Sequence, residues 1–310
     1  MKKVLLSLLM LVLVLLLGAA ALAEEKTETI TFQKTFTTDV NAEYIDLGKM
    51  RVEDMDKFIA FLRKMPNIKK VDMFTTKMYT KDIDKLAAAF PDVEFGWTMR
   101  IGDHWVRTDA TAFSTLHNNS SPMHTERNFK YLKYCKNLLA LDIGHNAVMD
   151  LSFLYDLPNL KVLILACNIN LKDITPVGSL KNLEYLELFK NDINDISCLA
   201  NCTNLIDLNI CFNRIKDWTP LHGLQNLERL WLYNSNNWSK DYPVDKQVVK
   251  ALEEALPNCH VDSISYSTLG GWREHERYYV IFHMFKYGEY IPFHRSLEIK
   301  EKYPNGINLN

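Results

Sequence analysis

The sequence predicts an α/β fold, a right-handed solenoid shaped like a horseshoe with a parallel sheet on its concave face. Irregular βα units are expected at the N-terminus and a helical cap at the C-terminus. Three observations support this fold class. Five segments between residues 138 and 235 share one apolar pattern, short polar segments separate them, and helical periodicity appears on both sides.

The five segments begin at leucines that follow one another in steps of 22, 23, 22 and 22 residues: Leu138, Leu160, Leu183, Leu205 and Leu227. Each segment starts with L-x-x-L-x-L or with Ile in the last position, and the first four carry Asn eight residues after the first leucine. This is the leucine-rich repeat pattern. Alternating apolar positions predict short strands with one buried face, which stack in parallel. The Asn predicts a tight turn, because its side chain bonds backbone groups and tolerates unusual dihedral angles.

The segments that return the chain from one strand to the next read MDLSFL, KDITPV, NDISCL and KDWTPL. They are too short and too rich in Asp, Ser, Thr and Pro for long helices, so we expect 3₁₀ or extended turns on the convex side. Together with the 22-residue step, these returns resemble those of the internalin-type class of leucine-rich repeat proteins. The resemblance covers about a third of the chain. It implies a secreted or surface-bound bacterial protein that binds a partner.

Residues 1–23 are predicted to be a secretory signal peptide. Lys2 and Lys3 precede an apolar run over residues 4–17, and the small residues Ala21 and Ala23 suit cleavage before Glu24. An uncleaved membrane anchor is the alternative, because the apolar run nearly reaches membrane-spanning length. We therefore expect a secreted or extracellular protein, and a periplasmic or wall-bound location stays open.

The repeats are predicted to occupy residues 131–235. The regions before and after them form two further predicted parts. Residues 24–130 are expected to be irregular βα units with strands at 44–48, 68–74 and 93–99, helices at 53–65 and 80–90, and a hairpin at 97–108 that turns at Gly102 and Asp103. Residues 236–310 are expected to form a C-terminal cap and tail, with a helix at 246–255, a strand at 259–263 and a helix over 273–288. A stack of repeats has an exposed end, which the last helix is expected to close.

The charge balance excludes two classes of partner. Without Lys2 and Lys3 the chain has 34 basic and 38 acidic residues, and neither kind is clustered. A nucleic-acid groove would require a basic stripe. The sequence predicts no nucleic-acid partner, and no membrane insertion once the signal segment is cleaved.

The cysteines raise the question of thiol chemistry, since Cys198 and Cys202 lie four positions apart. Cys202 occupies a position that holds leucine in other repeats, so packing alone explains it. Cys167 and Cys211 lie two strands apart, which is too far for a disulfide. A local bridge between Cys198 and Cys202 is the alternative. The motifs of zinc, calcium and nucleophilic sites do not occur, so we expect no metal, no cofactor and no catalytic residues.

The side of the predicted strands that points away from the core carries aromatic and charged side chains. Tyr, Trp and Arg commonly anchor interfaces, and exposed apolar patches tend to mark contact sites. The alternative is that the N-terminal hairpin or the C-terminal tail folds over this surface. The predicted partner-binding residues are Tyr185, Glu187, Phe189, Asp207, Asn209, Arg229, Trp231 and Tyr233.

The sequence therefore favours a non-enzymatic, monomeric binding protein that recognises a macromolecule, either a protein or a glycan, at a cell surface. Two alternatives stay open. One is an accessory subunit that docks through its C-terminal helix, over 273–288, and its tail, residues 290–310. The other is a hydrolase with a site in the N-terminal region, which would be favoured if Asp103, His104, His117 and His124 lay in one cleft.

Substitution of Cys202 tests its assignment as a packing residue. Cys202→Leu should be tolerated, whereas Cys202→Asp should cost several kcal/mol because it places a charge in the core. Urea unfolding of the purified variants measures both effects. Strong destabilisation by the leucine would mean that the thiol has a specific role.

Overall fold

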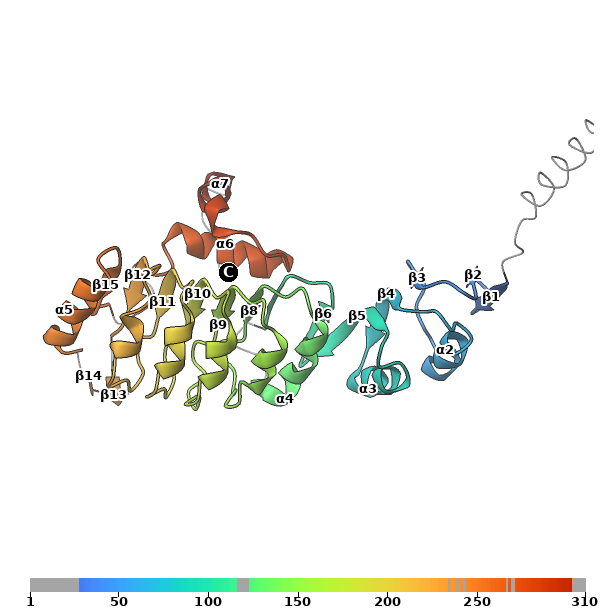
Figure 1. The fold of residues 1–310 in the computed structure, drawn as a ribbon, viewed down its shortest axis with the longest axis horizontal. Coiled ribbons are helices and arrows are strands. Elements are labelled where there is room, and N and C mark those ends of the chain that lie inside the picture. Colours follow the sequence, from blue (N-terminus) through green and yellow to red (C-terminus); the bar gives the residue numbers. More distant parts are fainter. Residues whose placement is uncertain are drawn as a thin grey trace, which may run out of the picture. The chain divides into compact units, whose positions relative to one another are not determined.

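The computed structural model describes residues 28–115, 123–233, 235–237, 240–241, 244–265, 267–268 and 271–302. The chain forms two compact units. The first consists of Met1–Met73 and Asp84–Phe95, and the second of Phe74–Ile83 and Gly96–Asn310 (Figure 1). The predicted signal segment lies outside the described residues.

The first unit is built around aromatic side chains from a hairpin and a helix. The ring of Phe32 lies 5.2 Å from each of the rings of Phe58 and Phe61. The helix begins after Asp54, whose carboxylate accepts a hydrogen bond from the Lys57 backbone N–H at 3.1 Å. The elements of this unit are β1 (Thr29–Phe32), β2 (Phe36–Asp39), β3 (Tyr44–Asp46) and α2 (Met55–Leu62).

Three elements contribute residues to both units: β4 (Lys70–Met78), α3 (Thr80–Ala89) and β5 (Glu94–Ile101). Strand β4 pairs in parallel with β3. Each of the strands predicted at 44–48, 68–74 and 93–99, and each of the helices predicted at 53–65 and 80–90, coincides with one observed element. The predicted hairpin is also present, because β5 pairs antiparallel with β6 (His104–Arg107) and the chain turns at Gly102 and Asp103.

The second unit is built on a seven-stranded parallel sheet in the order β15, β12, β11, β10, β9, β8, β7. Its strands are β7 (Ala112–Ser114), β8 (Ala140–Asp142), β9 (Val162–Ile164), β10 (Tyr185–Glu187), β11 (Asp207–Asn209), β12 (Arg229–Trp231) and β15 (His260–Asp262). The first residue of each strand pairs with the first residue of its neighbour, as Val162 does with Tyr185. The sheet extends beyond the predicted repeats on both sides, since β7 precedes residue 131 and β15 follows residue 235.

The repeat asparagines hold successive strands together. The Asn213 side-chain amide donates to the carbonyl of Ile210 in its own repeat at 3.0 Å and to that of Leu188 in the preceding repeat at 2.9 Å, and its oxygen accepts from the Ile193 N–H at 3.1 Å. Asn168 and Asn191 likewise bond carbonyls of two repeats. The predicted backbone bonding is confirmed. The left-handed backbone, however, falls on the residue before each Asn: His145, Cys167, Lys190 and Phe212.

The return segments are 3₁₀ turns, as predicted. Each starts at an Asp whose carboxylate accepts a hydrogen bond from the backbone N–H two residues later, at 2.8 to 3.0 Å. They are η2 (Ser152–Asp156), η3 (Thr175–Ser179), η4 (Ser197–Asn201) and η5 (Thr219–Leu221). Before them, α4 (Glu126–Phe129) and η1 (Lys130–Tyr134) lead into β8.

All six cysteines have free thiols. Cys202 is fully buried, in keeping with its leucine position. Burial raises the pKa of the Cys202 thiol to about 11 and that of Cys198 to about 12. Since the thiolate is the nucleophile, these thiols are inert at neutral pH.

The C-terminal segment lies on one face of the sheet, opposite the 3₁₀ returns (Figure 1). We call residues 271–302 the cover; they include Trp272, α6 (Glu276–Tyr287), η6 (Phe293–Arg295) and α7 (Ser296–Lys302). The helix over 273–288 was expected to close the end of the stack, and its position differs because it packs against the strands instead. The remaining elements are β13 (Ser235–Asn237), β14 (Lys240–Asp241) and α5 (Lys246–Ala255).

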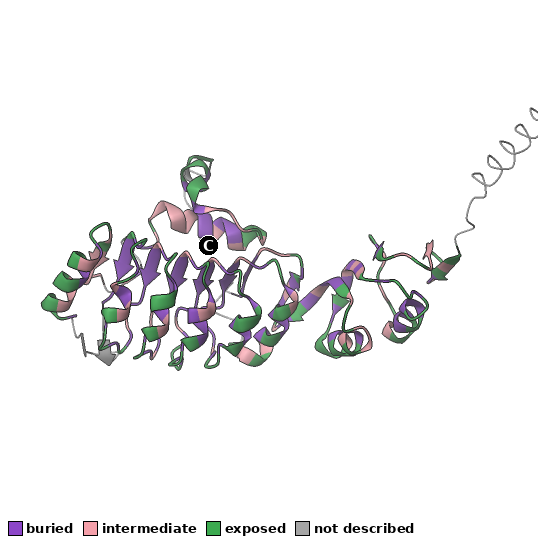
Figure 2. Cartoon of the chain, in the orientation of Figure 1, coloured by how far each residue is buried: buried purple, intermediate pink, exposed green. Residues whose placement is uncertain are grey.

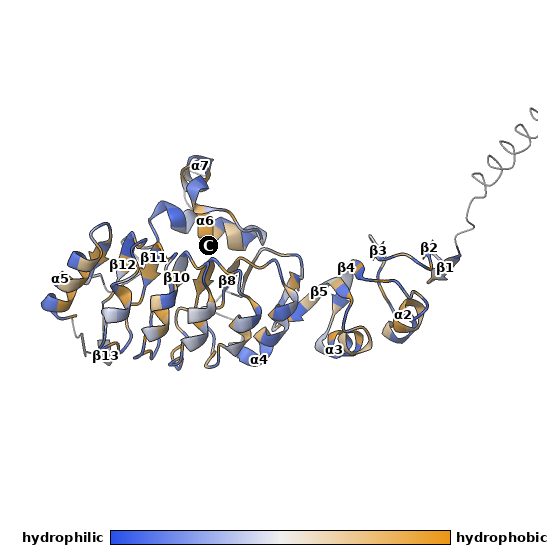
Figure 3. Ribbon diagram, viewed as in Figure 1, coloured by the Kyte–Doolittle hydropathy of each residue, from blue (hydrophilic) through white to orange (hydrophobic). Residues whose placement is uncertain are grey.

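The interface between the cover and the sheet is a second hydrophobic core. Figure 2 shows the strands as buried, and Figure 3 shows hydrophobic residues on both the strands and α6. Val280, Ile281 and Met284 of α6 are buried against small residues of the sheet such as Ala140 and Val162. We call the side of the sheet that they contact the covered face.

Removal of one repeat asparagine should destabilise the second unit. Asn213→Ala leaves two buried carbonyls and one N–H without the bonds described above, so we expect a loss of about 2–4 kcal/mol. The matched control is Asn204→Ala, because Asn204 is exposed and its amide donates only to the Lys181 carbonyl. Urea denaturation measures both. Equal effects of the two substitutions would contradict a structural role for the asparagines.

Candidate functional site

The eight predicted partner-binding residues lie together on the covered face. Tyr185, Asp207 and Arg229 are paired across β10, β11 and β12, and Glu187, Asn209 and Trp231 follow two residues later in the same register. The expectation that this surface faces solvent is wrong. Seven of the eight are buried and only Phe189 is half-buried, because the cover lies on them. Any contact of these residues with a partner stays a prediction.

Trp272 forms the centre of the contact between the cover and the sheet. Its ring is fully buried and lies 5.5 Å from that of Tyr185 and 5.6 Å from that of Trp231. The Trp272 indole N–H donates to Glu187 Oε2 at 3.1 Å, and the Tyr185 hydroxyl donates to the same oxygen at 3.0 Å. The guanidinium of Arg229 stacks over the Trp272 ring at 4.4 Å. Aromatic side chains that suit a binding interface therefore contact the cover of the same chain.

A buried ionic cluster fixes the start of α6 on the sheet. Asp207 is fully buried and accepts two hydrogen bonds from Arg229 of β12, at 2.8 and 2.7 Å. It accepts two more from Arg277 of α6, both at 2.8 Å. Arg277 also donates to Glu228 at 2.6 Å. Paired, bidentate geometry of this kind is what a buried charge requires.

The acidic residues under the cover differ in their protonation behaviour. Burial alone would raise the pKa of Asp207, but the hydrogen bonds from Arg229 and Arg277 outweigh it, and the pKa is lowered. Glu187 has a raised pKa because burial outweighs the influence of Arg273 and the hydrogen bonds from Trp272 and Tyr185. Asp207 is therefore a stable anion, while Glu187 is held closer to protonation.

Asp142 on β8 is a second buried acid of the covered face. Its carboxylate accepts from the Gly144 N–H and from the Ser114 hydroxyl, both at 3.0 Å. Burial raises its pKa to about 6, although both hydrogen bonds oppose the shift. The Asp142 carboxyl, with a pKa of about 6, therefore changes its protonation state in a mildly acidic solution.

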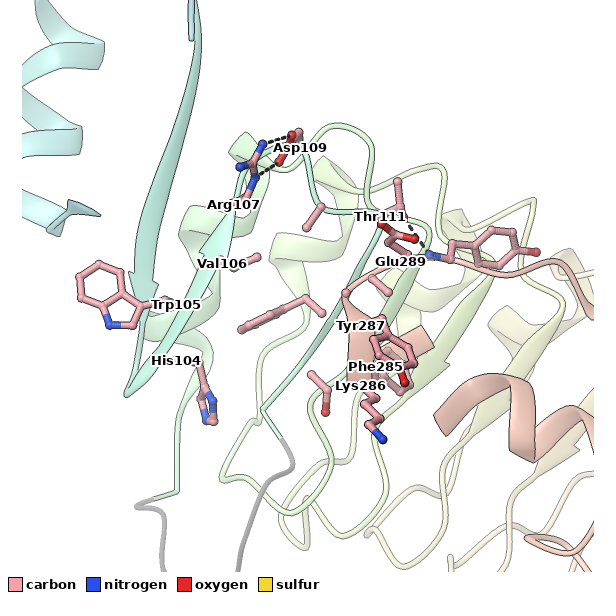
Figure 4. Close-up of a pocket in the computed structure, with 16 residues that line it drawn as sticks. His104, Trp105, Val106, Arg107, Asp109, Thr111, Phe285, Lys286, Tyr287 and Glu289 are labelled. Carbon is pink, nitrogen blue, oxygen red and sulfur yellow. Dashed lines mark hydrogen bonds and ion pairs between the residues drawn. The ribbon is translucent and has the colours of Figure 1, made fainter. Parts of the chain in front are cut away.

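A groove of 740 Å³ lies where α6 ends, on the same side of the second unit as the cover (Figure 4). One wall is formed by β6 and β7, and the other by the residues around Tyr287 and Glu289. Figure 4 shows Arg107 paired with Asp109 on one side and the last turn of α6 on the other. The Tyr287 side chain is about half exposed. Sequence reasoning missed this groove, because it depends on where α6 ends.

Three of the four N-terminal residues named above lie together. His124 Nε2 lies 2.8 Å from Asp103 Oδ1, and His104 Nε2 lies 3.0 Å from the same oxygen. Both histidines are buried, whereas Asp103 is about one-third exposed. His117 lies outside the described residues. The local sequence spacing gave no metal-ligand motif, because His124 follows Asp103 by 21 residues.

The acidic stretch at 191–197, which superficially resembles a calcium-binding loop, is explained by the repeat. In the stretch at 191–197, Asn191 is one of the repeat asparagines and Asp195 accepts from the Ser197 N–H at the start of a return turn. Asp192 pairs with Arg214 at 2.7 Å. These contacts account for the acidic residues without an ion.

Comparison with known proteins supports the class of the repeats. Residues 181–221 and 203–245 match the family of leucine-rich repeats in two copies. No curated protein sequence matches the chain.

Among solved structures, internalin C2 of Listeria monocytogenes is 26% identical, with coverage of 50% of this chain and 73% of its own and a TM-score of 0.36. A leucine-rich repeat protein of Leptospira interrogans is 19% identical, with coverage of 71% and 54% and a TM-score of 0.39. The Arabidopsis receptor kinase HAESA, solved with a peptide hormone and a co-receptor, is 18% identical, with coverage of 69% and 29% and a TM-score of 0.31. The chain thus spans about half or less of the length of the last two structures.

The chain contains leucine-rich repeats, and these repeats build a parallel sheet. None of the helices in the described ranges is long and apolar enough to cross a bilayer.

The raised pKa of Asp142 predicts a pH-dependent stability. Because the folded state holds the proton up to about pH 6 and an unfolded Asp releases it near 3.8, the wild type should lose stability as the pH rises from about 4 to 6. Asp142→Asn should lose less, so that the difference between the two changes by up to about 3 kcal/mol over this range.

Urea unfolding at pH 4, 5, 6 and 7 measures this effect. Asp156→Asn, which changes an exposed carboxylate on a return turn, is the matched control and should follow the wild type. If Asp142→Asn also follows the wild type at every pH, the assignment of the titrating group is wrong.

Proposed function

We propose that this chain is a secreted, non-enzymatic protein whose leucine-rich repeat unit binds a protein partner at a cell surface. Leucine-rich repeat proteins typically bind proteins, and stacked repeats present extended surfaces for that purpose. The observation that carries the proposal is the groove at the end of α6, because aromatic and charged side chains line it beside the repeat sheet's first strand, β7.

The groove has the composition of a protein-binding surface. Tyr287 is exposed, and the Lys286 ammonium lies 5.5 Å from the centre of its ring. Glu289 and Arg107 line the same groove, so both signs of charge are available to orient a partner. Tyrosine and arginine are the residue types that contribute most at interfaces.

The covered face is proposed as a second contact surface, used only if the cover leaves the sheet. The cover follows the repeats in the chain and is held on the sheet by non-covalent contacts. Its release would expose Tyr185, Trp231 and the other predicted residues. The same geometry argues against the accessory-subunit alternative for residues 290–302, because Phe293 and Ile299 are buried within the chain.

We do not extend the proposal to hydrolysis. The Asp103, His104 and His124 cluster meets part of the condition set for a hydrolase. A hydrolytic site also requires a nucleophile or an activated water next to a group that stabilises the transition state. The cluster by itself supplies neither.

Binding measurements on an identified protein partner test the groove. Affinity capture with the chain from Glu24 onward supplies the partner, and Tyr287→Ala with Lys286→Glu should weaken its binding at least about tenfold. Tyr155→Ala is the matched control, because Tyr155 is equally exposed but lies on the return turn η2, so it should leave the affinity unchanged.

An Arg277→Ala variant separates the two surfaces. Loss of the Arg277 contacts with Asp207 and Glu228 loosens the cover, so a partner that binds the covered face should bind this variant more tightly. A partner of the groove should bind it no more tightly than it binds the wild type, because residues 285–290 of the same cover line the groove. If the groove variant keeps full affinity, the groove is not the binding surface. If neither variant changes the affinity, both proposed surfaces are wrong.

A further inference from the structure

The tip of the β5–β6 hairpin places three metal-ligating side chains around one point. One oxygen of Asp103 lies 3.0 Å from His104 Nε2 and 2.8 Å from His124 Nε2. All the potential ligand atoms lie within 4.8 Å of one another. Ligands of a tetrahedral zinc ion bound at 2.0–2.1 Å are about 3.3 Å apart, so both Asp103–histidine distances are within about 0.5 Å of the spacing that the ion requires.

The backbone of His124 is held in place by the first repeat. Its N–H donates to the side-chain oxygen of Asn146 at 2.8 Å, and its carbonyl accepts from the Ala147 N–H at 2.8 Å. Asn146 is the first of the repeat asparagines and also donates to Thr115 at 2.9 Å. The ligand therefore has a rigid support, which a metal site requires.

Both imidazole rings are also fixed by packing. The His104 ring contacts that of Phe113 edge to face at a centroid distance of 6.4 Å, and the His124 ring contacts that of Phe129 in the same way at 6.3 Å. The His124 ring lies against Gly102, where an added Cβ would come within 2.2 Å of the ring. Gly102 has a left-handed backbone with a φ of 59°, which glycine adopts readily in a turn. Because glycine has no side chain, it also leaves room for the His124 ring.

The chemistry of the three ligands selects the kind of ion. Two imidazoles and one carboxylate suit zinc and neighbouring divalent transition metals, whereas calcium and magnesium prefer sites made of oxygen ligands alone. The exposure of Asp103 leaves a path from solvent to the buried nitrogens. Three protein ligands leave the fourth position of a tetrahedral ion for water or another donor.

We propose that Asp103, His104 and His124 form a binding site for a divalent transition metal ion of the zinc type. The ion joins the tip of the β5–β6 hairpin to the segment that starts the first repeat. This site does not depend on the proposed protein-binding function.

Zinc titration of the purified chain tests the site. The chain from Glu24 onward is prepared without a histidine tag, treated with a chelator, and titrated with ZnCl₂ by calorimetry. We expect one saturable equivalent per chain, and a rise of about 5–10 °C in Tm when free zinc is about 100 times its Kd. Cobalt(II) in place of zinc should give the visible absorption of a four- or five-coordinate ion.

Variants separate this site from other histidines. Asp103→Asn and His124→Gln should each lower the zinc affinity at least about 100-fold, since even the loss of an outer partner costs up to that factor. Gly102→Ala should lower it with all three ligands present, because the new methyl group displaces the His124 ring. The controls are His294→Gln, at an exposed histidine, and Asp156→Asn, both with wild-type affinity expected.

Circular dichroism before titration shows whether each variant is folded. Absence of a saturable equivalent in the wild type would overturn the proposal. Zinc binding that persists at wild-type affinity in folded Asp103→Asn and His124→Gln would overturn it as well, since the ion would then lie elsewhere.

Discussion

The carboxylate of Asp207 determines how the second unit is assembled. A buried anion of this kind is unfavourable unless it is fully paired, and here the two guanidinium groups come from different parts of the chain, Arg229 from the sheet and Arg277 from α6. The sheet alone would leave half of the hydrogen bonds of Asp207 unmade. The C-terminal helix therefore stabilises the folded repeat stack.

The repeats were predictable because their determinants are local and periodic. Leucines at fixed offsets must face one side of a strand, and an asparagine such as Asn213 can satisfy backbone groups of two repeats only if the strands stack in register. The positions of β8 to β12 and of the 3₁₀ returns follow from these constraints. The helices and strands of residues 44–101 were also located, since their apolar periodicity is strong.

The cover could not be placed from the sequence, because its contacts join residues far apart in the chain. Trp272 and Glu187 are 85 positions apart, and nothing in the pattern around α6 distinguishes the end of a stack from its face. One sequence signal was present. The aromatic residues on the side of the strands that points away from the core were consistent with coverage by the C-terminal tail. The cluster of Asp103 with His124 has the same character, because a hairpin and a loop bring the two together only in three dimensions.

The two ends of α6 contact strands that are not neighbours. Arg277 bonds Asp207 on β11, and the Gly288 carbonyl accepts from the Ala112 N–H on β7, four strands away. Four strand spacings amount to about 19 Å, and the eleven residue steps from Arg277 to Gly288 rise about 17 Å. The length of α6 thus nearly equals the distance across the sheet from β7 to β11. Gain or loss of a repeat would change this span by one strand spacing, about 4.8 Å, so the length of α6 suits the present number of repeats between β7 and β11.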